Sequence, residues 1–327
     1  MPEAVCLGEA LIDFISLEPG VSIMEASGFR KLPGGAPANV SAAIAKLGCS
    51  SAFVGKVGED PFGRFLERTL LESGVDVSHM IFDKSARTGL AFVSLKADGV
   101  PDFTFYRNPS ADMLLERSDL DEVLLSSARI FHYGSISLIS EPSRGATIEA
   151  ARIARAGGAI ISYDPNLRLS LWEDAETAKM GMIEGLSGAN IVKLSEEELS
   201  FITGSSDIKD GVRILRSISD SIELVMVTRG PAGCFYDNRT ASGSVAGVKV
   251  AVTDTTGAGD AFVGAVLSQV LQRNFGLEDI GELPKLELDS ISTIANAVGA
   301  LATTKRGAIA SLPTKEELQA FLRRNAN

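Results

Sequence analysis

Residues 254–262 read D-T-T-G-A-G-D-A-F and run directly into the apolar stretch V-G-A-V-L-S-Q-V-L. Gly257 and Gly259 allow close approach of the backbone, and a helix predicted to begin at about Asp260 leaves unpaired N–H groups at its N-terminus. Those groups predict an anion site of the kind that cradles a phosphate. Asp260 would then accept a proton from an attacking hydroxyl while the amides stabilise a transferring phosphoryl group. The local sequence equally allows a second interpretation, in which Asp260 only caps its helix.

Two familiar nucleotide-binding loops do not match this stretch. The chain contains no G-x-x-x-x-G-K-[ST] sequence, and Gly257, Gly259 and Gly264 miss the G-x-G-x-x-G spacing. A Walker-type NTPase and a dinucleotide-dependent enzyme are therefore disfavoured.

Composition narrows the function further. The chain has 327 residues, of which 45% are hydrophobic, and a formal net charge of -11. An acidic surface disfavours nucleic acid and anionic membranes as partners, because both are bound through clustered Lys and Arg. Only two histidines occur, at positions 79 and 132. We therefore expect carboxylates, backbone amides and cations to carry the chemistry, rather than a His-ligated metal or a Ser-His-Asp triad.

The cysteines and the chain start indicate a compartment. Cys6, Cys49 and Cys234 lie far apart in apolar surroundings and lack C-x-x-C spacing, which is typical of buried thiols in a reducing environment. A strand-like A-V-C-L-G follows Met1 within a few residues, and no apolar run reaches the length of a membrane span. We expect a cytoplasmic protein.

Short apolar runs alternate with longer helical patterns along the chain. Such alternation predicts βαβ units and a mostly parallel sheet covered on both faces by helices. Strands are expected at 4–8, 52–57, 129–134, 159–164, 190–194 and 224–228. Helices are expected at 37–47, 61–73, 142–156 and 175–186.

Two segments break this rhythm. Residues 88–107 alternate with period two on either side of Asp98-Gly99, a dipeptide that signals a hairpin. Residues 16–32 are polar and contain glycine. We interpret both as a small β lid within a single domain that spans residues 1–327.

A second glycine cluster lies near the first strand. Gly34 and Gly35 in P-G-G-A-P-A-N precede a predicted helix, and Asn39 falls one turn inside it. Alone, this pattern is more often a turn. Asp13, however, follows the first strand, so both groups are expected at the carboxyl end of that strand, where open α/β sheets bind ligands.

These motifs resemble the pfkB, or ribokinase-like, family of sugar kinases over essentially the full length. Its two signatures match P-G-G-A-P-A-N and D-T-T-G-A-G-D-A-F. The blocks G-E-A-L-I-D-F, F-Y-R-N-P-S-A-D-M-L-L, F-H-Y-G-S-I-S-L-I and S-Y-D-P-N-L-R-L-S-L-W resemble the fructokinase branch. The resemblance implies a three-layer α/β sandwich with a mostly parallel central sheet and a small β-sheet lid.

The resemblance also implies roles for individual residues. The implied catalytic set is Asp260 as base, Gly257, Ala258 and Gly259 as anion hole, and Arg168. The implied sugar-binding set is Asp13, Gly34, Gly35, Asn39, Phe105, Arg107 and Asp260. The implied ATP-binding set is Lys193, Glu196, Thr228, Gly230, Gly233, Thr255, Gly257, Gly259 and Asn296. The residues that resemble those around a monovalent cation such as K⁺ are Asp254, Thr256, Ala302, Gly307 and Ser311.

Several of these assignments have a purely structural alternative. An isolated Arg, such as Arg107 or Arg168, is more often a salt-bridged residue than a ligand contact. Many relatives carry N-x-x-E, which we match to K-L-S-E, with Lys193 in place of Asn and Glu196 retained. Yet Ser195 to Glu198 is also a capping box, and Glu196 would complement the helix dipole.

The function implied is that of an ATP-dependent fructokinase that phosphorylates the 6-hydroxyl of D-fructose, with Mg²⁺ bridging the phosphates. A kinase for 2-keto-3-deoxygluconate, ribose or a riboside is an alternative on the same scaffold. A non-catalytic sugar-binding protein is a third hypothesis, against which the intact Asp260 argues. The exposed edge of the lid hairpin is compatible with a homodimer formed through the lid.

Overall fold

The computed structural model describes residues 1–95 and 101–325. In these residues the main sheet has nine strands in the order β13-β12-β11-β10-β9-β8-β1-β4-β5. The strands from β5 to β11 pair in parallel, whereas β11, β12 and β13 pair antiparallel. Their bounds are β1 Ala4–Leu7, β4 Ser51–Gly58, β5 Met80–Asp83, β8 Ile130–Gly134, β9 Ile160–Asp164, β10 Ile191–Ser195, β11 Leu224–Thr228, β12 Cys234–Asn238 and β13 Ser242–Val245.

Helices cover both faces of this sheet, because successive strand residues point to opposite sides. Ala4 and Cys6 of β1 belong to one buried cluster, and Val5 and Leu7 belong to the other. The first face carries α1 Ala36–Lys46, α2 Pro61–Glu72, α8 Ala258–Gln272, α9 Leu277–Ile280, α10 Lys285–Ala302, α11 Ala308–Ser311 and α12 Lys315–Asn325. The second carries α3 Glu122–Ser127, α4 Ser143–Ala156, α5 Ala175–Gly185, α6 Glu196–Thr203 and α7 Ile208–Ile218. The three-layer sandwich expected from the sequence is confirmed.

Helix α8 is the central helix of the first face. Its residues are buried on every side except near the two ends, as expected for a helix that is apolar all round. It packs against α1 and α10. Gly264 lies so close to α1 that a Cβ placed there would approach Ala43 Cβ to 2.4 Å. The small residues A-P-A-N-V-S-A-A of α1 thus let two glycine-opened helices run together.

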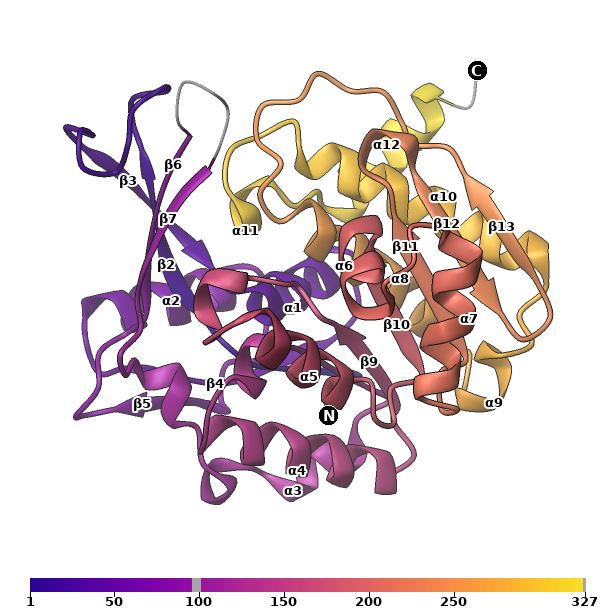
Figure 1. Cartoon of the computed structure of the whole chain (residues 1–327), viewed down its shortest axis with the longest axis horizontal. Coiled ribbons are helices and arrows are strands. Elements are labelled where there is room, and N and C mark those ends of the chain that lie inside the picture. Colours follow the sequence, from indigo (N-terminus) through magenta and orange to yellow (C-terminus); the bar gives the residue numbers. More distant parts are fainter. Residues whose placement is uncertain (96–100, 326–327) are drawn as a thin grey trace.

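A second, smaller sheet stands apart from the main one, at the upper left in Figure 1. Its strand order is β3-β2-β6-β7, with bounds β2 Leu11–Ser16, β3 Phe29–Gly34, β6 Leu90–Leu95 and β7 Pro101–Tyr106. Strands β2 and β6 pair in parallel, while β3 and β7 pair antiparallel on the two edges.

The small sheet matches the expected lid with one correction. Strands β6 and β7 form the predicted hairpin, although Asp98-Gly99 lies outside the described residues. The predicted segment 16–32 is mainly the connection between two strands, and these strands reach back to Leu11 and on to Gly34. The sequence concealed this because Asp13 interrupts an otherwise apolar strand. Asp13 therefore lies within the small sheet rather than before it.

The six strands and four helices expected in the main body are all present, with ends shifted by at most one residue. None of the helices in the described part of the chain combines the length and apolar character needed to cross a bilayer.

The packing of α8 on α1 makes a stability prediction. Gly264→Ala should destabilise the fold by about 1–3 kcal/mol, because the new methyl overpacks the contact with Ala43. Gly299→Ala, in α10, is the matched control, because a Cβ placed there would lie 3.3 Å from the nearest atom, the carbonyl oxygen of Ala258. Urea unfolding measures both. Equal stability of the two variants would show that the α1–α8 contact accommodates a methyl group without strain.

Candidate active site

A cavity of about 540 Å³ opens at the carboxyl ends of β1, β8, β9, β10 and β11. This is the edge at which open α/β sheets bind ligands. Its walls come from the segments that follow these strands, from the starts of α1 and α8, and from one face of the small sheet. Of the predicted residues, the cavity is lined by Asp13, Gly35, Asn39, Phe105, Arg168, Lys193, Thr228, Thr255, Thr256, Gly257, Gly259 and Asp260.

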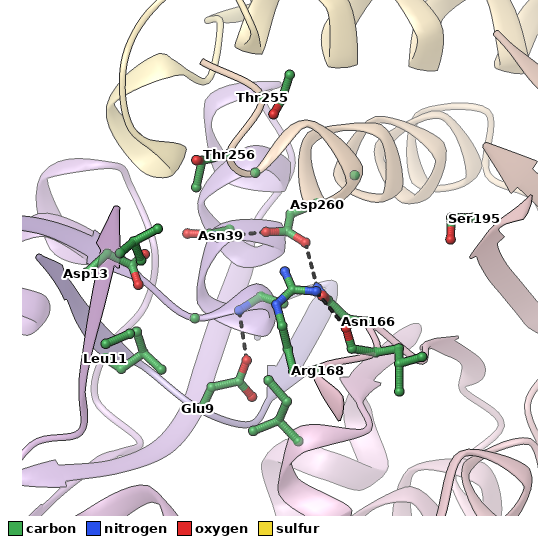
Figure 2. Close-up of a pocket in the computed structure, with 18 of the residues that line it drawn as sticks. Glu9, Leu11, Asp13, Asn39, Asn166, Arg168, Ser195, Thr255, Thr256 and Asp260 are labelled. Atoms are coloured by element: carbon green, nitrogen blue, oxygen red, sulfur yellow. Dashed lines mark hydrogen bonds between the residues drawn. The ribbon is translucent and has the colours of Figure 1, made fainter. Parts of the chain in front are cut away.

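Asp260 is not the cap of α8. The helix begins at Ala258, and its N-cap is Gly257, whose φ of 76° lies in the left-handed region that favours glycine. The carboxylate of Asp260 instead accepts hydrogen bonds from two carboxamides, Asn39 Nδ2 at 2.7 Å and Asn166 Nδ2 at 3.3 Å. Figure 2 shows these two amides on either side of it. The helix-cap interpretation is therefore wrong, and Asp260 is held facing the cavity.

The surroundings of Asp260 suit a proton acceptor. Burial raises its pKa, while the hydrogen bond from Asn39 and the charges of Lys193 and Arg168 oppose the rise. A general base works best when its pKa moves towards the working pH. Asp260 combines this direction of shift with an orientation fixed from two sides.

Asn166 is a site residue that the sequence analysis missed. It lies in the D-P-N-L-R loop after β9 and has a φ of 44°, unusual for a residue with a side chain. Its backbone N–H donates to Asp164 Oδ1 at 3.2 Å, and the next N–H, from Leu167, donates to Glu198 Oε1 at 2.8 Å. The loop is thus anchored on both sides. Its position two residues before Arg168, in a loop that directly follows a predicted strand, could have indicated Asn166 from the sequence.

Lys193 is a cation beside the predicted anion hole at the start of α8. Its Nζ donates to Asp164 Oδ2 at 3.0 Å, and a Cβ placed on Gly259 would lie 3.1 Å from that Nζ. Burial alone would lower the pKa of Lys193, but Asp164 and Glu198 outweigh it and raise the pKa. Lys193 therefore stays protonated next to the amides at the start of α8.

The structure corrects the match of K-L-S-E. Glu196 is 48% exposed in its side chain, pairs with Arg229 at 3.0 Å and does not line the cavity. Glu198 lines the cavity, and it forms the predicted capping box with Ser195. Glu196 and Glu198 lie two residues apart in the first turn of α6, so their side chains point to different sides of the helix. Glu198 therefore faces the cavity and Glu196 faces the surface.

Asp13 and the glycine turn form the other end of the cavity. Burial raises the pKa of Asp13 to about 7, with Arg168 opposing the rise and Asp260 adding to it. Gly34 does not line the cavity itself, but a Cβ there would lie 2.2 Å from Asp13 Oδ2. Gly34 is therefore required for the position of Asp13. Phe105 extends from β7 into the same end.

Arg107 does not reach the cavity. Its side chain is only 5% exposed, and both Nε and Nη2 donate to Asp112 Oδ2. The structural alternative, a salt-bridged Arg, is correct for this residue. Arg168 lines the cavity and lies between Asn166 and Glu9 in Figure 2.

A second cavity of about 570 Å³ adjoins the first. It is mostly apolar and holds the predicted residues Thr228, Gly230, Gly233, Thr255, Ala258, Gly259 and Asn296. Asn296 Nδ2 donates to the carbonyls of Val245 and Ala246 at 3.1 and 3.2 Å, which fixes the wall after β13. The sequence analysis missed the segment 247–250 and Phe262 on the same walls. The two cavities share Thr228, Thr255 and Gly259.

Of the residues expected around a monovalent cation, Asp254, Thr256 and Gly307 are joined by hydrogen bonds. Asp254 accepts from the N–H and hydroxyl of Thr256 and from the N–H of Gly307 at 2.9 Å. Its own N–H donates to the carbonyl of Thr303, next to Ala302. Ser311 instead donates to the carbonyl of Ala308. Among the described residues, three or more His, Cys, Asp or Glu side chains do not converge anywhere as metal ligands would.

This arrangement can transfer a phosphoryl group. A buried carboxylate stands beside the N-terminus of α8, where Gly257 and Gly259 line the cavity, with Lys193 and Arg168 as nearby cations. The amides and cations can stabilise negative charge on a phosphate, while Asp260 takes the proton of an attacking hydroxyl.

Comparison with known proteins places the chain in a family. The model of the "pfkB family carbohydrate kinase" matches residues 1–315. The chain belongs to this family.

Named relatives and solved structures agree with this family. The chain is 50% identical to a probable fructokinase-6, chloroplastic, of Arabidopsis thaliana, covering 98% of this chain and 82% of the relative. It is 49% identical to fructokinase-1 of Oryza sativa subsp. japonica, covering 96% and 95%. A fructokinase from Xylella fastidiosa with bound ATP superposes with a TM-score of 0.91 at 35% identity, over 100% of both chains. A fructokinase from Vibrio cholerae O395 in a form with fructose, ADP and calcium ion gives 0.83 at 37%, over 98% and 99%.

Asp260→Asn tests the proton acceptor. The variant is nearly isosteric but cannot take a proton, so turnover should fall by roughly 10²–10⁴-fold, with both substrates still bound. Steady-state kinetics and calorimetric binding measure this. Near-wild-type turnover in a pure sample of the variant would remove Asp260 from the chemistry.

Proposed function

We propose that this protein is an ATP-dependent fructokinase that phosphorylates the 6-hydroxyl of D-fructose. The observation that carries the proposal is the position of Asp260 and the anion hole, where the two cavities meet at Thr228, Thr255 and Gly259. A sugar in the first cavity and a nucleotide in the second would bring hydroxyl and γ-phosphate together only there. Relatives named as fructokinases, near 50% identical over almost the whole chain, support fructose as the sugar.

The proposed reaction uses residues already described. Asp13, Gly35 and Asn39 hold sugar hydroxyls, and a carboxylate such as Asp13 can accept from two of them. Asp260 accepts the proton of the 6-hydroxyl as that oxygen attacks the γ-phosphorus, and the bond to the β-phosphate oxygen breaks, leaving ADP. The amides of Gly257, Ala258 and Gly259 receive the developing charge.

Cations complete the proposal. Mg²⁺ would come with ATP, because this ion prefers phosphate oxygens plus one or two carboxylates; Glu197 and Glu198 are the carboxylates on the wall beside Lys193. Bound, it would neutralise phosphate charge. K⁺ is proposed near Asp254, whose carboxylate, the hydroxyl of Thr256 and the carbonyl of Thr303 belong to one hydrogen-bond network. One Vibrio cholerae fructokinase structure has a potassium ion bound.

The same scaffold serves related sugars, so the substrate needs a direct test. A structure of an aminoimidazole riboside kinase from Salmonella enterica also superposes, with a TM-score of 0.81 at 30% identity. Its lower identity favours fructose over a riboside for this chain. A non-catalytic sugar-binding protein would have no use for a buried base beside an anion hole.

The small sheet is proposed as a lid. Leu11, Asp13, Ile15, Val93 and Phe105 project from it into the first cavity. A cover over this end would exclude water during phosphoryl transfer and so limit ATP hydrolysis.

The outer face and edges of the small sheet are where a second copy would bind. On the outer face, the ring of Phe92 contacts those of Phe14, Phe29 and Tyr106, and Tyr106 is 63% exposed. Edge strands such as β3 and β7 can pair with another chain. A homodimer formed through the lid remains part of the proposal.

Cytoplasmic location remains a proposal as well. The three cysteines are buried and unpaired, which suits a reducing compartment. One relative is named chloroplastic.

A panel of sugars tests the substrate. ADP release should be fastest with D-fructose and Mg²⁺-ATP, and slower with 2-keto-3-deoxygluconate, ribose and aminoimidazole riboside. The product should carry its phosphate on O6, as shown by NMR. Preference for any other sugar would contradict fructose as substrate, and no turnover on any sugar would contradict kinase activity itself.

Amide exchange tests the lid. Fructose, rather than ATP, should slow exchange in strands β2, β3, β6 and β7, because the sugar contacts the face of this sheet. ATP alone should protect residues 228–233 instead. Unchanged exchange in the four strands with fructose would mean that the cover does not move.

A further inference from the structure

Glu9 is a buried carboxylate whose role the proposed reaction leaves open. It follows β1 and is only 2% exposed, yet it lines the first cavity together with Leu11, Asp13 and Gly35. Figure 2 shows it near Arg168, at the lower end of the labelled side chains, with Asp260 above. Buried carboxylates are rare in proteins unless they are fully paired.

One oxygen of Glu9 holds the start of α1. The N–H of Ala36 donates to Glu9 Oε1 at 2.9 Å. This helix has no cap of its own, because its N-cap is Gly35 and Pro37 has no N–H. A Cβ on Gly35 would lie 2.3 Å from the carbonyl oxygen of Glu9, so the turn rests directly on this residue. Glu9 therefore fixes the position of the Gly35 turn, from which α1 leads to Asn39.

The other oxygen has no hydrogen-bond partner in the described structure. Glu9 Oε2 is buried and unsatisfied, which costs free energy in the unliganded protein. Burial raises the pKa of Glu9 to about 7; the N–H of Ala36 and the charge of Arg107 oppose this rise, and Asp112 adds to it. Arg107 donates from Nε and Nη2 to Asp112 rather than to Glu9.

We propose that Glu9 is a sugar-binding residue, with Oε1 fixing the glycine turn and Oε2 accepting a hydroxyl of the bound sugar. This inference rests on the proposed function. A hydroxyl is the partner that the site lacks, since it donates a proton without bringing negative charge.

The test compares Glu9→Gln with Glu9→Ala. Gln keeps an acceptor for the Ala36 N–H but puts an amide N–H₂ in place of Oε2. Glu9→Gln should raise the KM for fructose by about tenfold or more, as expected when a buried hydrogen-bond acceptor is replaced by an amide donor that faces the same hydroxyl, with the KM for ATP unchanged. Glu9→Ala should be worse and should also lower kcat, because Asn39 and Asp260 lose their support. Glu59→Gln, on the surface, controls for the lost charge.

Deoxy analogues of fructose identify the contact. In the wild type, the analogue that lacks the contacted hydroxyl should bind about tenfold more weakly than fructose. In Glu9→Gln, this analogue and fructose should bind with about equal affinity. Calorimetry without ATP measures this. A wild-type KM for fructose in Glu9→Gln, or equal weakening of sugar and ATP in it, would overturn the proposal. If the wild type phosphorylates a different sugar, the proposed function fails, and the same comparison is made with deoxy analogues of that sugar.

Discussion

The hydrogen bond from Asn39 to Asp260 joins the two halves of the site. Asn39 lies one turn into α1 and Asp260 one turn into α8, 221 residues further along the chain. The bond requires the two helices to run side by side, which Gly264 and Ala43 permit by their small size. Both helices open with glycine at the N-cap. The first residues of both helices, Gly35 and Ala36 at α1 and Gly257 and Gly259 at α8, therefore line the same cavity as Asp260.

The cluster of charges around this bond explains why the site is placed so deep. Asp13, Asp164 and Asp260 are buried close to Lys193 and Arg168, and burial raises the pKa of each carboxyl. Such an arrangement opposes folding, since like charges are held out of water. It suits a reaction in which a proton leaves a hydroxyl and negative charge builds on a phosphate. Stability is given up where the chemistry requires it.

Much of the fold could be predicted from the sequence, because buried parallel strands and amphipathic helices leave clear periodic patterns. Asp260 and Asn39 could be placed in the cavity because each follows a glycine turn, and Asp13 because it follows β1, whereas Lys193, inside β10, came from the resemblance to the family. Glu198 could not be separated from Glu196, since both occupy the first turn of α6 and only the helix direction decides which faces the cavity. Arg107 depended on Asp112, five residues further on, whose burial no local pattern shows. Asn166 reaches Asp260 from a left-handed backbone conformation, which the sequence does not indicate at this position.

The small sheet contributes to one cavity only. Leu11, Asp13, Ile15, Val93 and Phe105 line the first cavity, whereas the second is bounded by loops after β11 and β13 and by α8 and α10. A lid at this sheet would therefore close over the first cavity alone and leave the second open to solvent. Release of a ligand from the first cavity would then slow as solvent viscosity rises, and release from the second would not.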